Sequence, residues 1–471
     1  MPENEARQRS YWPIVLGLVI AEVALTFEIT MIYAALPRLN AIFHNRDHVG
    51  WLVTVFMMVS AGAAAVGGRL GDIYGRRRVV LVALMIATCG SMISGLSGTL
   101  AGVLLGRTLQ GVAACVLPLS IGLVRDHLPS GRTAIGIGVV LSSASIGYGA
   151  GNLVGGYVID HFDWPALFHV TAVLAGVGWA AVYALVPPDR DARRVKQKLD
   201  VLGGALFVPG IALIIYGLTE MRTKGWLDVT ACLPVAAGLV LLAIWFWVEM
   251  RSDAPLVDVR AVFRGQVGIA NLVMALSAAT MYQMVLIGSL MMQQPPETGI
   301  GFGKTATFYG SVTIPGALLA VLASPLAGAL AGRFGAGAVL LTAFSINVPL
   351  WCLMVLNASS LVWVCALMTA VTVIGAVVLT CVPNLIIESI DSRRTGEFVG
   401  FAVVLRHLFG GVGAQLAVSL LAGRIEFPAG SHVMYPGPVA YFTLFGLYGV
   451  AGLIMLGLVS GMKSKALRTS A

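Results

Sequence analysis

The chain has 471 residues, and only 11% of them are charged, against about 25% in an average soluble domain. Hydrophobic residues make up 58%, so too few polar side chains remain to cover a water-soluble protein of this size. These values exclude an ordinary soluble enzyme, and the apolar content excludes intrinsic disorder. A helical membrane protein with many spans is the class that remains.

The net charge is +8, and the chain contains six cysteines. The positive residues follow a membrane topology and are not gathered into one patch, so no DNA or RNA partner is predicted. The cysteines fall inside long apolar runs and lack the spacings of a zinc site or a disulfide framework. We expect no metal site, and the absence of HExxH and GxSxG motifs predicts that the protein is not an enzyme.

Fourteen apolar runs follow one another, each about 18 to 25 residues long, which is enough to cross a bilayer as a helix. The first is too long and lies too deep in the chain to be a cleaved signal peptide. An all-α integral membrane protein with 14 transmembrane helices is therefore predicted. The runs begin near Trp12, His48, Arg78, Thr99, Ala134, Pro165, Val201, Asp228, Gln266, Thr305, Ala336, Leu361, Gly396 and Val439.

The distribution of Lys and Arg predicts which side of the membrane each loop faces, because cytoplasmic loops carry the excess. One side of the predicted topology collects 22 of the 30 positive residues, the other side has 6, and the last two lie inside spans. Both termini belong to the richer side. We expect both of them to be cytoplasmic.

An internal repeat appears at an offset of 260 residues: the segment 68–75 recurs as 328–335. The same offset maps spans 1 to 5 onto spans 9 to 13, and a parallel repeat of this kind predicts two six-helix halves. Spans 7 and 8 are then an insertion. The predicted division is 1–188 for the N-terminal half, 189–264 for a basic linker with two additional helices, and 265–471 for the C-terminal half.

Three ionisable side chains are identified well inside the spans: Glu28, Arg107 and Arg406. Such groups are rare in hydrocarbon, so function is the first hypothesis. At 1.5 Å per residue, Glu28 and Arg107 each lie about 6 to 8 Å outward of the midplane, so they meet if their helices are neighbours. A carboxylate that faces a cavity near an arginine suits proton coupling. A buried ion pair that only fixes helix register is the alternative.

The loop between spans 2 and 3 combines glycines, one carboxylate and three arginines. Glycines allow a tight turn, and the carboxylate can cap a helix or pair with a basic residue, forming a latch that breaks when the two halves move. A plain positive-inside anchor is the alternative. The residues that would form this cytoplasmic latch are Gly68, Asp72, Gly75, Arg76 and Arg77.

Span 5 carries glycines at four-residue spacing, which leaves one helix face bare for close packing. This seam serves packing alone, or it also controls exchange between conformations. The residues are Gly147, Gly151, Asn152, Gly155 and Gly156.

Polar and thioether side chains in several spans are candidates for lining a substrate cavity. Thioethers suit a promiscuous apolar pocket, although filling the core is the alternative for each of them. Arg406, beside His407, has an anion-binding, gating or packing role. The candidates are Met31, Tyr33, Gln110, Gln283, Met284, Asn384 and Arg406.

These segments together resemble the 14-helix drug:proton antiporter branch of the major facilitator superfamily, over nearly the whole chain. The segment 68–77 is similar to the loop signature of the family, Arg107-x-x-Gln110-Gly111 to its span 4 signature, and 27–37 to its span 1 signature. The resemblance implies alternating access, a proton exchanged for a small-molecule substrate, and Arg107 tuning a protonation in span 1. It also implies a monomer in a bacterial inner membrane, driven by the proton gradient without a cofactor.

The sequence departs from the pattern of this branch at three positions. Glu28 stands where Asp is usual, which keeps the titratable group and lengthens its reach by one methylene. Asn152 replaces the expected proline of the span 5 signature, and Gly332 replaces the acidic residue of the second loop. The main hypothesis is a proton-coupled exporter of amphipathic or aromatic compounds. Proton-coupled uptake or facilitated transport of an organic anion is the alternative, suggested by Asn152 and by two intramembrane arginines against one carboxylate.

Overall fold

The computed structural model describes residues 11–43, 49–188, 201–225, 227–251, 259–262, 264–389, 395–422, 425–426 and 435–469. Within these residues the chain is almost entirely helical. Thirteen of the described helices are long and apolar enough to cross a membrane, and a fourteenth, α4, passes the same test although it is bent by 45°. The predicted all-α fold with 14 spans is therefore confirmed.

The first six spans pack into one bundle. Thr99 caps the helix that follows it by accepting a hydrogen bond from Gly102 N, and Pro165 occupies a first helical position, where its missing N–H is not needed. The elements are α2 (Trp12–Phe43), α4 (Trp51–Tyr74), α5 (Arg76–Leu96), α6 (Leu100–Gly111), η1 (Val112–Cys115), α7 (Val116–His127), α8 (Ser130–His161) and α9 (Pro165–Leu185).

The last six spans form the second bundle, and a two-stranded hairpin precedes the final helix. The strand register pairs Ile425 with Pro436 and Glu426 with Tyr435. The elements are α12 (Val259–Val262), α13 (Gly265–Ala279), η2 (Met281–Gln283), α14 (Met284–Gln293), η3 (Pro296–Thr298), α15 (Ala306–Phe334), α16 (Ala336–Leu356), α17 (Leu361–Ile387), α18 (Thr395–Ala422), β1 (Ile425–Glu426), β2 (Tyr435–Pro436) and α19 (Pro438–Thr469).

Two inserted helices, α10 (Val201–Lys224) and α11 (Val229–Glu249), lie between the bundles in sequence. Asp228 caps α11 by accepting hydrogen bonds from Thr230 N and Ala231 N. A hydrogen bond from the side chain of Thr230 is the main cause that lowers the pKa of Asp228. The basic stretch 189–198, predicted as a linker, lies outside the described residues, so the predicted domain boundaries stay predictions.

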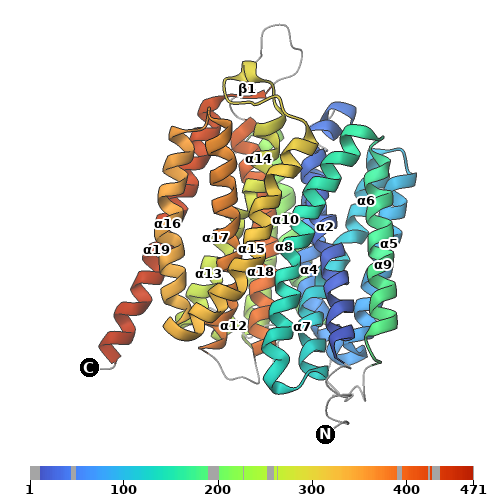
Figure 1. Cartoon of the computed structure of the whole chain (residues 1–471), viewed down its shortest axis with the longest axis vertical. Coiled ribbons are helices and arrows are strands. Elements are labelled where there is room, and N and C mark those ends of the chain that lie inside the picture. The colour runs from blue at the N-terminus through green and yellow to red at the C-terminus, as the bar shows by residue number, and fades with distance from the viewer. Residues whose placement is uncertain are drawn as a thin grey trace.

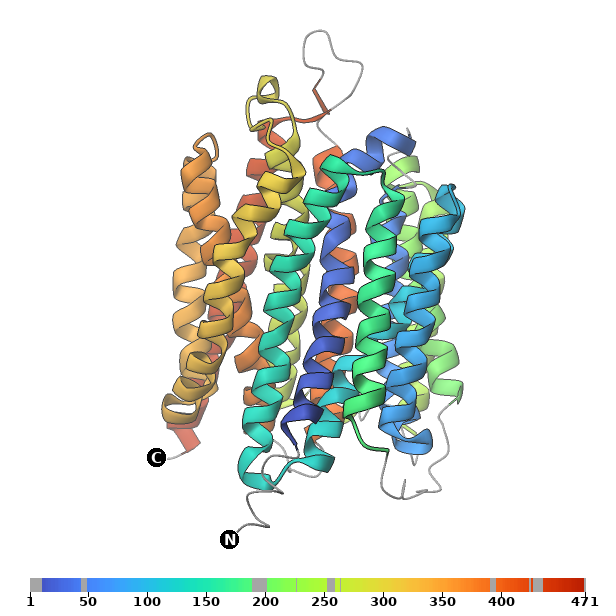
Figure 2. The same ribbon diagram turned by 45° about the vertical axis from the view of Figure 1, so that its right-hand side comes forward.

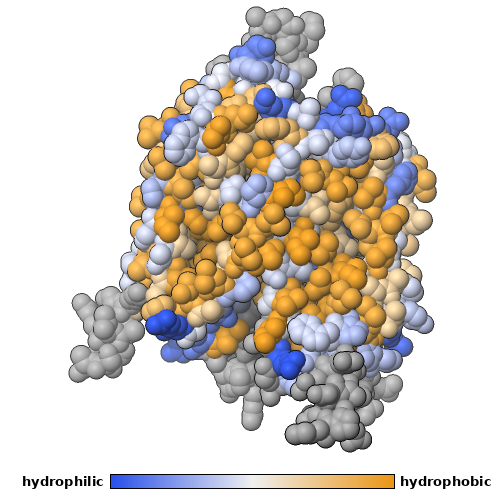
Figure 3. Space-filling view, viewed as in Figure 1, coloured by the Kyte–Doolittle hydropathy of each residue, from blue (hydrophilic) through white to orange (hydrophobic). Residues whose placement is uncertain are grey.

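The helices run roughly parallel to one long axis (Figure 1), and apolar side chains cover the middle of the face shown in Figure 3. The start of α2 and the end of α19 lie at the same end of the bundle (Figure 1). We call this end the terminal face and the opposite end, where β1 lies, the distal face. The turned view separates the C-terminal helices α15, α16 and α19 from the N-terminal helices α5 and α9 (Figure 2).

The glycines of α8 allow it to pack closely against two helices. A Cβ on Gly151 would stand 2.7 Å from Phe27 O of α2, and one on Gly147 would stand 2.7 Å from Val23 O. A Cβ on Gly155 would stand 2.9 Å from the Cα atom of Met31 in α2. A Cβ on Gly156 would stand 2.3 Å from Ala306 O of α15, in the other half. The glycines therefore form two seams, one within the first half and one between the halves.

Candidate functional site

Glu28 is buried inside the N-terminal half, with 2% of its surface exposed. Ser91 of α5 donates a hydrogen bond from its hydroxyl to Oε1 of the Glu28 carboxylate at 2.9 Å. Gln110 of α6 donates from Nε2 to the same hydroxyl oxygen at 2.8 Å. Because both partners belong to the first half, the carboxylate points into that bundle. The sequence predicts that the Glu28 carboxylate faces a cavity; in this structure it contacts Ser91 of the same half instead.

Arg107 completes a chain of polar contacts that begins at Glu28. Its Nη1 atom donates to Gln110 Oε1 at 2.9 Å and to the main-chain oxygen of Glu28 at 3.2 Å. Its Nε atom donates to Leu52 O at 3.1 Å, and its guanidinium carbon lies 4.3 Å from the centroid of the Phe56 ring. Glu28 and Arg107 thus lie side by side as the depth arithmetic suggests, but Ser91 and Gln110 connect the two charged groups.

Two glycines make this chain of contacts geometrically possible. A Cβ on Gly106 of α6 would stand 2.3 Å from Gly90 O, and one on Gly90 of α5 would stand 2.6 Å from Gly106 O. The two helices therefore touch through their backbones. This close approach holds Ser91 and Gln110 within hydrogen-bonding distance.

A second carboxylate, Glu22, is buried in the same helix, and the sequence analysis overlooked it. The count of three ionisable groups inside the spans is therefore wrong. Glu22 is 2% exposed, its side chain hydrogen-bonds with Thr26, and it interacts electrostatically with Arg406 of α18 in the other half. The same rule that singled out Glu28, an ionisable residue within an apolar run, applies to Glu22 and was sufficient to find it.

The other candidate cavity residues differ in their burial and contacts. Gln283 is buried and donates from Nε2 to Ala278 O at 2.7 Å and to Gly410 O at 3.0 Å. Tyr33 is 8% exposed, and Met31 and Met284 are buried. Asn384 is partly buried near the C-terminal end of α17. Their roles in substrate binding stay predictions.

The loop between α4 and α5 holds an ion-pair cluster on the terminal face. Gly75 turns the chain with a φ of 95°, a conformation that favours glycine. The Arg76 guanidinium then donates to Asp72 Oδ1 at 3.0 Å and to Asp126 Oδ2 of α7 at 2.9 Å. In this state the cluster therefore joins three helices of one half.

The neighbouring loop residues have different environments. Arg77 donates to Tyr183 O at 2.7 Å. A Cβ on Gly68 would meet nothing within 4 Å, so no close packing requires a glycine there. Gly111, in the span 4 signature, does pack closely, since its Cβ would stand 2.8 Å from Phe56 O.

Asn152, which stands where a proline was expected, is fully buried. Its Nδ2 atom donates to Tyr148 O at 2.9 Å, one turn earlier in the same helix. Its Oδ1 atom has no hydrogen-bond partner. The side chain therefore bonds within α8 through its nitrogen.

Hydrogen bonds fasten the two halves together near the distal face. Ser289 Oγ of α14 donates to Tyr33 O of α2 at 2.6 Å, and Gln293 Nε2 donates to Ala34 O at 3.0 Å. Asp160, at the end of α8, accepts a hydrogen bond from Thr307 N of α15 at 2.7 Å. A carboxylate at a helix N-terminus is a favourable arrangement. We call these contacts the distal clasp.

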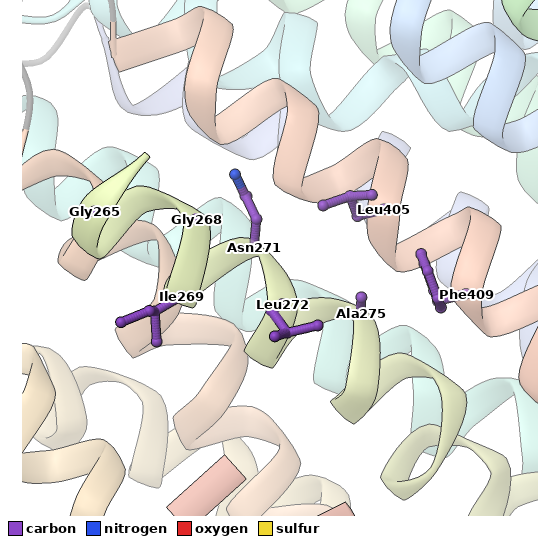
Figure 4. Close-up of a pocket in the computed structure, with 8 residues that line it drawn as sticks. All are labelled: Gly265, Gly268, Ile269, Asn271, Leu272, Ala275, Leu405 and Phe409. Carbon is purple, nitrogen blue, oxygen red and sulfur yellow. The ribbon is translucent and has the colours of Figure 1, made fainter. Parts of the chain in front are cut away.

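A pocket of about 360 Å³ lies between α13 and α18 (Figure 4). Its walls are apolar except for Asn271, whose Nδ2 atom donates to Val262 O at 2.9 Å. Leu405 and Phe409 of α18 point toward α13 across the opening (Figure 4). The pocket is separate from the Glu28 contacts, since all its lining residues belong to the second half. They are Gly265, Gly268, Ile269, Asn271, Leu272, Ala275, Leu405 and Phe409.

Comparison with known proteins decides the family. The profile of the Major Facilitator Superfamily matches residues 18–414. The chain belongs to this superfamily. It is 25% identical to the tetracenomycin C resistance and export protein of Streptomyces glaucescens, over 88% of this chain and 76% of that protein. It is also 25% identical to the multidrug resistance protein Stp of Mycobacterium tuberculosis, over 88% of this chain and 77% of that one.

Solved structures of this superfamily share the fold. The human organic anion transporter MFSD10 superposes with a TM-score of 0.63 at 15% identity, over 96% of this chain and 99% of that one. A D-xylose–proton symporter superposes with a TM-score of 0.65 at 14% identity, over 96% and 97%. Its membership of the superfamily, together with the names of its relatives, identifies the protein as an integral membrane transporter with many spans, and not as an enzyme.

Proposed function

We propose that the protein is a proton-coupled exporter of amphipathic or aromatic compounds that works by alternating access. The names of its relatives support export, because two of them denote resistance to, or export of, antibacterial or other drug compounds. The contact chain from Glu28 through Ser91 and Gln110 to Arg107 is the single observation that supports proton coupling most directly.

Glu28 is the group that carries the proton in this proposal. When Glu28 is ionised, its negative charge balances the positive charge of Arg107, and the Ser91 hydroxyl donates to its carboxylate. When it is protonated, the carboxyl group becomes a donor, and the Arg107 charge loses its nearby counter-charge. If the proton binds to Oε1, the atom that accepts from Ser91, the Ser91 hydroxyl turns away to accept instead, and the change passes to Gln110 and Arg107. Because Arg107 also holds Leu52 O of α4, protonation alters how α2, α4 and α6 are tied together.

Substrate crosses between the halves as they rock around it. The distal clasp closes one side in this structure. We infer that the terminal face is cytoplasmic, because its loops collect most of the positive residues. The cluster of Asp72, Arg76 and Asp126 then lies on the cytoplasmic side, where it fixes the loop that changes partners as the halves move. The bacterial origin of the relatives favours a bacterial plasma membrane.

The test is the substrate-driven change of pH in proteoliposomes that contain the wild type, Glu28→Gln or Glu28→Asp. The substrate panel contains lipophilic cations, neutral aromatic compounds and aromatic acids. We expect at least one compound to dissipate the gradient with the wild type, no coupled flux with Glu28→Gln, and retained flux with Glu28→Asp. Glu220→Gln, on the inserted helix α10, is the matched control.

Proton flux that persists in Glu28→Gln would show that Glu28 is not the carrier. Movement of organic acids alone, without proton counter-flux, would favour the alternative, uptake or facilitated transport of an organic anion. The observation that keeps this alternative in view is the presence of two arginines, Arg107 and Arg406, within the membrane spans.

A further inference from the structure

One face of α2 is directed at the space between the halves. Glu22, Thr26, Ile29 and Tyr33 follow one another at intervals of four, three and four residues, which places them on one side of a helix. Thr26 and Ile29 are partly exposed in the interior of the bundle. Tyr33 contacts the other half through its main-chain oxygen, which accepts from Ser289.

Glu28 lies on a different face. It is six residues after Glu22, which at about 100° per residue turns it by about 240° around the helix axis. Its contacts with Ser91 and Gln110 follow from this direction. The two carboxylates of α2 therefore serve different surroundings: Glu28 the interior of one half, and Glu22 the interface between both.

Glu22 is an incompletely satisfied group. Its Oε2 atom is buried without a hydrogen-bond partner, and a buried carboxylate oxygen without a donor is costly. Arg406 acts on it electrostatically from α18 but does not hydrogen-bond to that oxygen. A donor placed between the two side chains would satisfy this oxygen.

Glu22 and Arg406 also match in depth. Glu22 follows the start of α2 by about 15 Å and Arg406 follows the start of α18 by about 16 Å, at 1.5 Å per residue. Both helices start at the terminal face (Figure 1). One aromatic side chain lies with this pair: Tyr282 interacts electrostatically with Arg406.

We propose that Glu22 and Arg406 form a recognition pair for an aromatic substrate that carries a protonated amine and a carbonyl group. The amine donates to the free Oε2 atom of Glu22, and Arg406 donates to the carbonyl oxygen. The Tyr282 ring provides an apolar wall with a polar tip. This inference rests on the proposed function only in taking this interface as the path of the substrate. Because the pair spans both halves, a substrate bound to it draws them together.

The test is equilibrium binding to the purified full-length protein in detergent, without a proton gradient. Three probes of similar size separate the two contacts: tryptophan methyl ester carries both groups, tryptamine carries only the amine, and methyl indole-3-acetate carries only the carbonyl. The wild type is expected to bind the first probe more tightly than either of the others. Glu220→Gln is the matched control and is expected to bind like the wild type.

Glu22→Gln is expected to weaken binding of tryptophan methyl ester and tryptamine at least tenfold, about the value of one charged hydrogen bond, and to leave methyl indole-3-acetate within twofold. Arg406→Gln is expected to weaken binding of the ester probes and to spare tryptamine. Glu22→Asp keeps the charge and is expected to retain part of the amine binding, which separates loss of the contact from loss of folding.

Equal weakening of all three probes by Glu22→Gln, or no binding of tryptophan methyl ester to the wild type, would overturn the recognition pair. The proposed proton coupling is measured separately by Glu28-dependent flux. A normal flux with unselective binding therefore rejects the recognition pair alone, and selective binding without flux rejects proton coupling alone.

Discussion

The two halves of the molecule repeat the same arrangement of helices but differ in the polarity of their interiors. Adding 260 to each residue number of the Glu28 contact chain gives its counterpart in the second half. All four counterparts are apolar or lack a side chain. The pairs are Glu28 with Gly288, Ser91 with Trp351, Arg107 with Leu367, and Gln110 with Ala370.

The counterpart positions are part of an apolar core. Trp351 and Leu367 are buried, with 1% and 3% of their surfaces exposed, and a Cβ on Gly288 would stand 2.4 Å from Cε of Met368. A duplicated fold can thus confine its buried charge chemistry to one half, while the other half supplies a rigid apolar partner. Arg406 is the exception: it interacts electrostatically with Glu22 of the first half as well as with Tyr282 of its own half.

The loops on the terminal face differ in the same direction. Gly75 and Gly335 turn with φ values of 95° and 82°, so the turn itself is repeated. In the first half Asp126 binds the side chain of Arg76, whereas in the second half Glu388 accepts a hydrogen bond from the main-chain nitrogen of Ala336 at 3.2 Å. An acidic residue holds the start of the next helix in both cases, through a side chain in one and through the backbone in the other.

The largest expected effect comes from making the first half resemble the second at Arg107. Arg107→Leu leaves Leu52 O, Glu28 O and the Gln110 side chain without their donor, and breaking a buried charged contact costs about 3 to 5 kcal/mol. We expect transport to fall at least tenfold and the thermal unfolding temperature to drop. Leu367→Ile, at the counterpart position, is the control. Transport within twofold of the wild type in Arg107→Leu would contradict a special role of the first half.

A smaller effect is expected at the glycine contact between α5 and α6. The counterpart of Gly106 is Ala366, so Gly106→Ala again imitates the second half. The added Cβ would stand 2.0 Å from Ser94 Oγ and 2.3 Å from Gly90 O, and overpacking of this kind costs about 1 to 3 kcal/mol. Thermal unfolding and efflux should both weaken. Gly176→Ala, where a Cβ meets nothing within 4 Å, should change neither, and equal effects of the two variants would refute the packing argument.

The smallest effect is expected when the second half is made to resemble the first. Gly332→Asp introduces the acidic residue that the second loop lacks, at a position where a Cβ meets nothing within 4 Å. No arginine like Arg76 stands at the start of α16, since its first residue is Ala336. Efflux is expected to stay within twofold of the wild type, and Asp72→Gly, the reverse change in the first loop, is expected to reduce it more. A reduction by Gly332→Asp as large as that by Asp72→Gly would contradict this difference between the two loops.

Much of the fold could be predicted from the sequence, because long apolar runs mark the membrane spans. Glu28 and Arg107 could be found as ionisable residues at equal depth. The direction of Glu28 could not, because depth arithmetic does not give the rotation of a helix about its axis. Glu22 could also have been found, because it is a second ionisable residue in the apolar run that contains Glu28.

Other parts of the site depend on features that composition does not mark. The 3₁₀ segment η1 interrupts span 4 immediately after Gly111, and η2 interrupts span 9 at Met281–Gln283. η1 is as apolar as the helices around it, and η2 is only three residues long, so periodicity gives no signal at either segment. Ser91 also has no distinguishing pattern, since a serine in a span bonds to its own backbone as readily as to a distant carboxylate.

The inserted helix α10 contacts both halves of the transporter. Val208 lies against Gly62 of α4, 3.0 Å from the position of an added Cβ, and Ile215 lies against Gly411 of α18 at 3.4 Å. The helix α10 therefore contacts both bundles. In the alternating-access cycle proposed above, the halves can turn only if at least one of these two contacts slides. Because the two glycines have no side chains, Val208 and Ile215 meet no protruding group at these contacts and can slide past them. If the halves move as proposed, the insertion guides that motion along one side of the molecule.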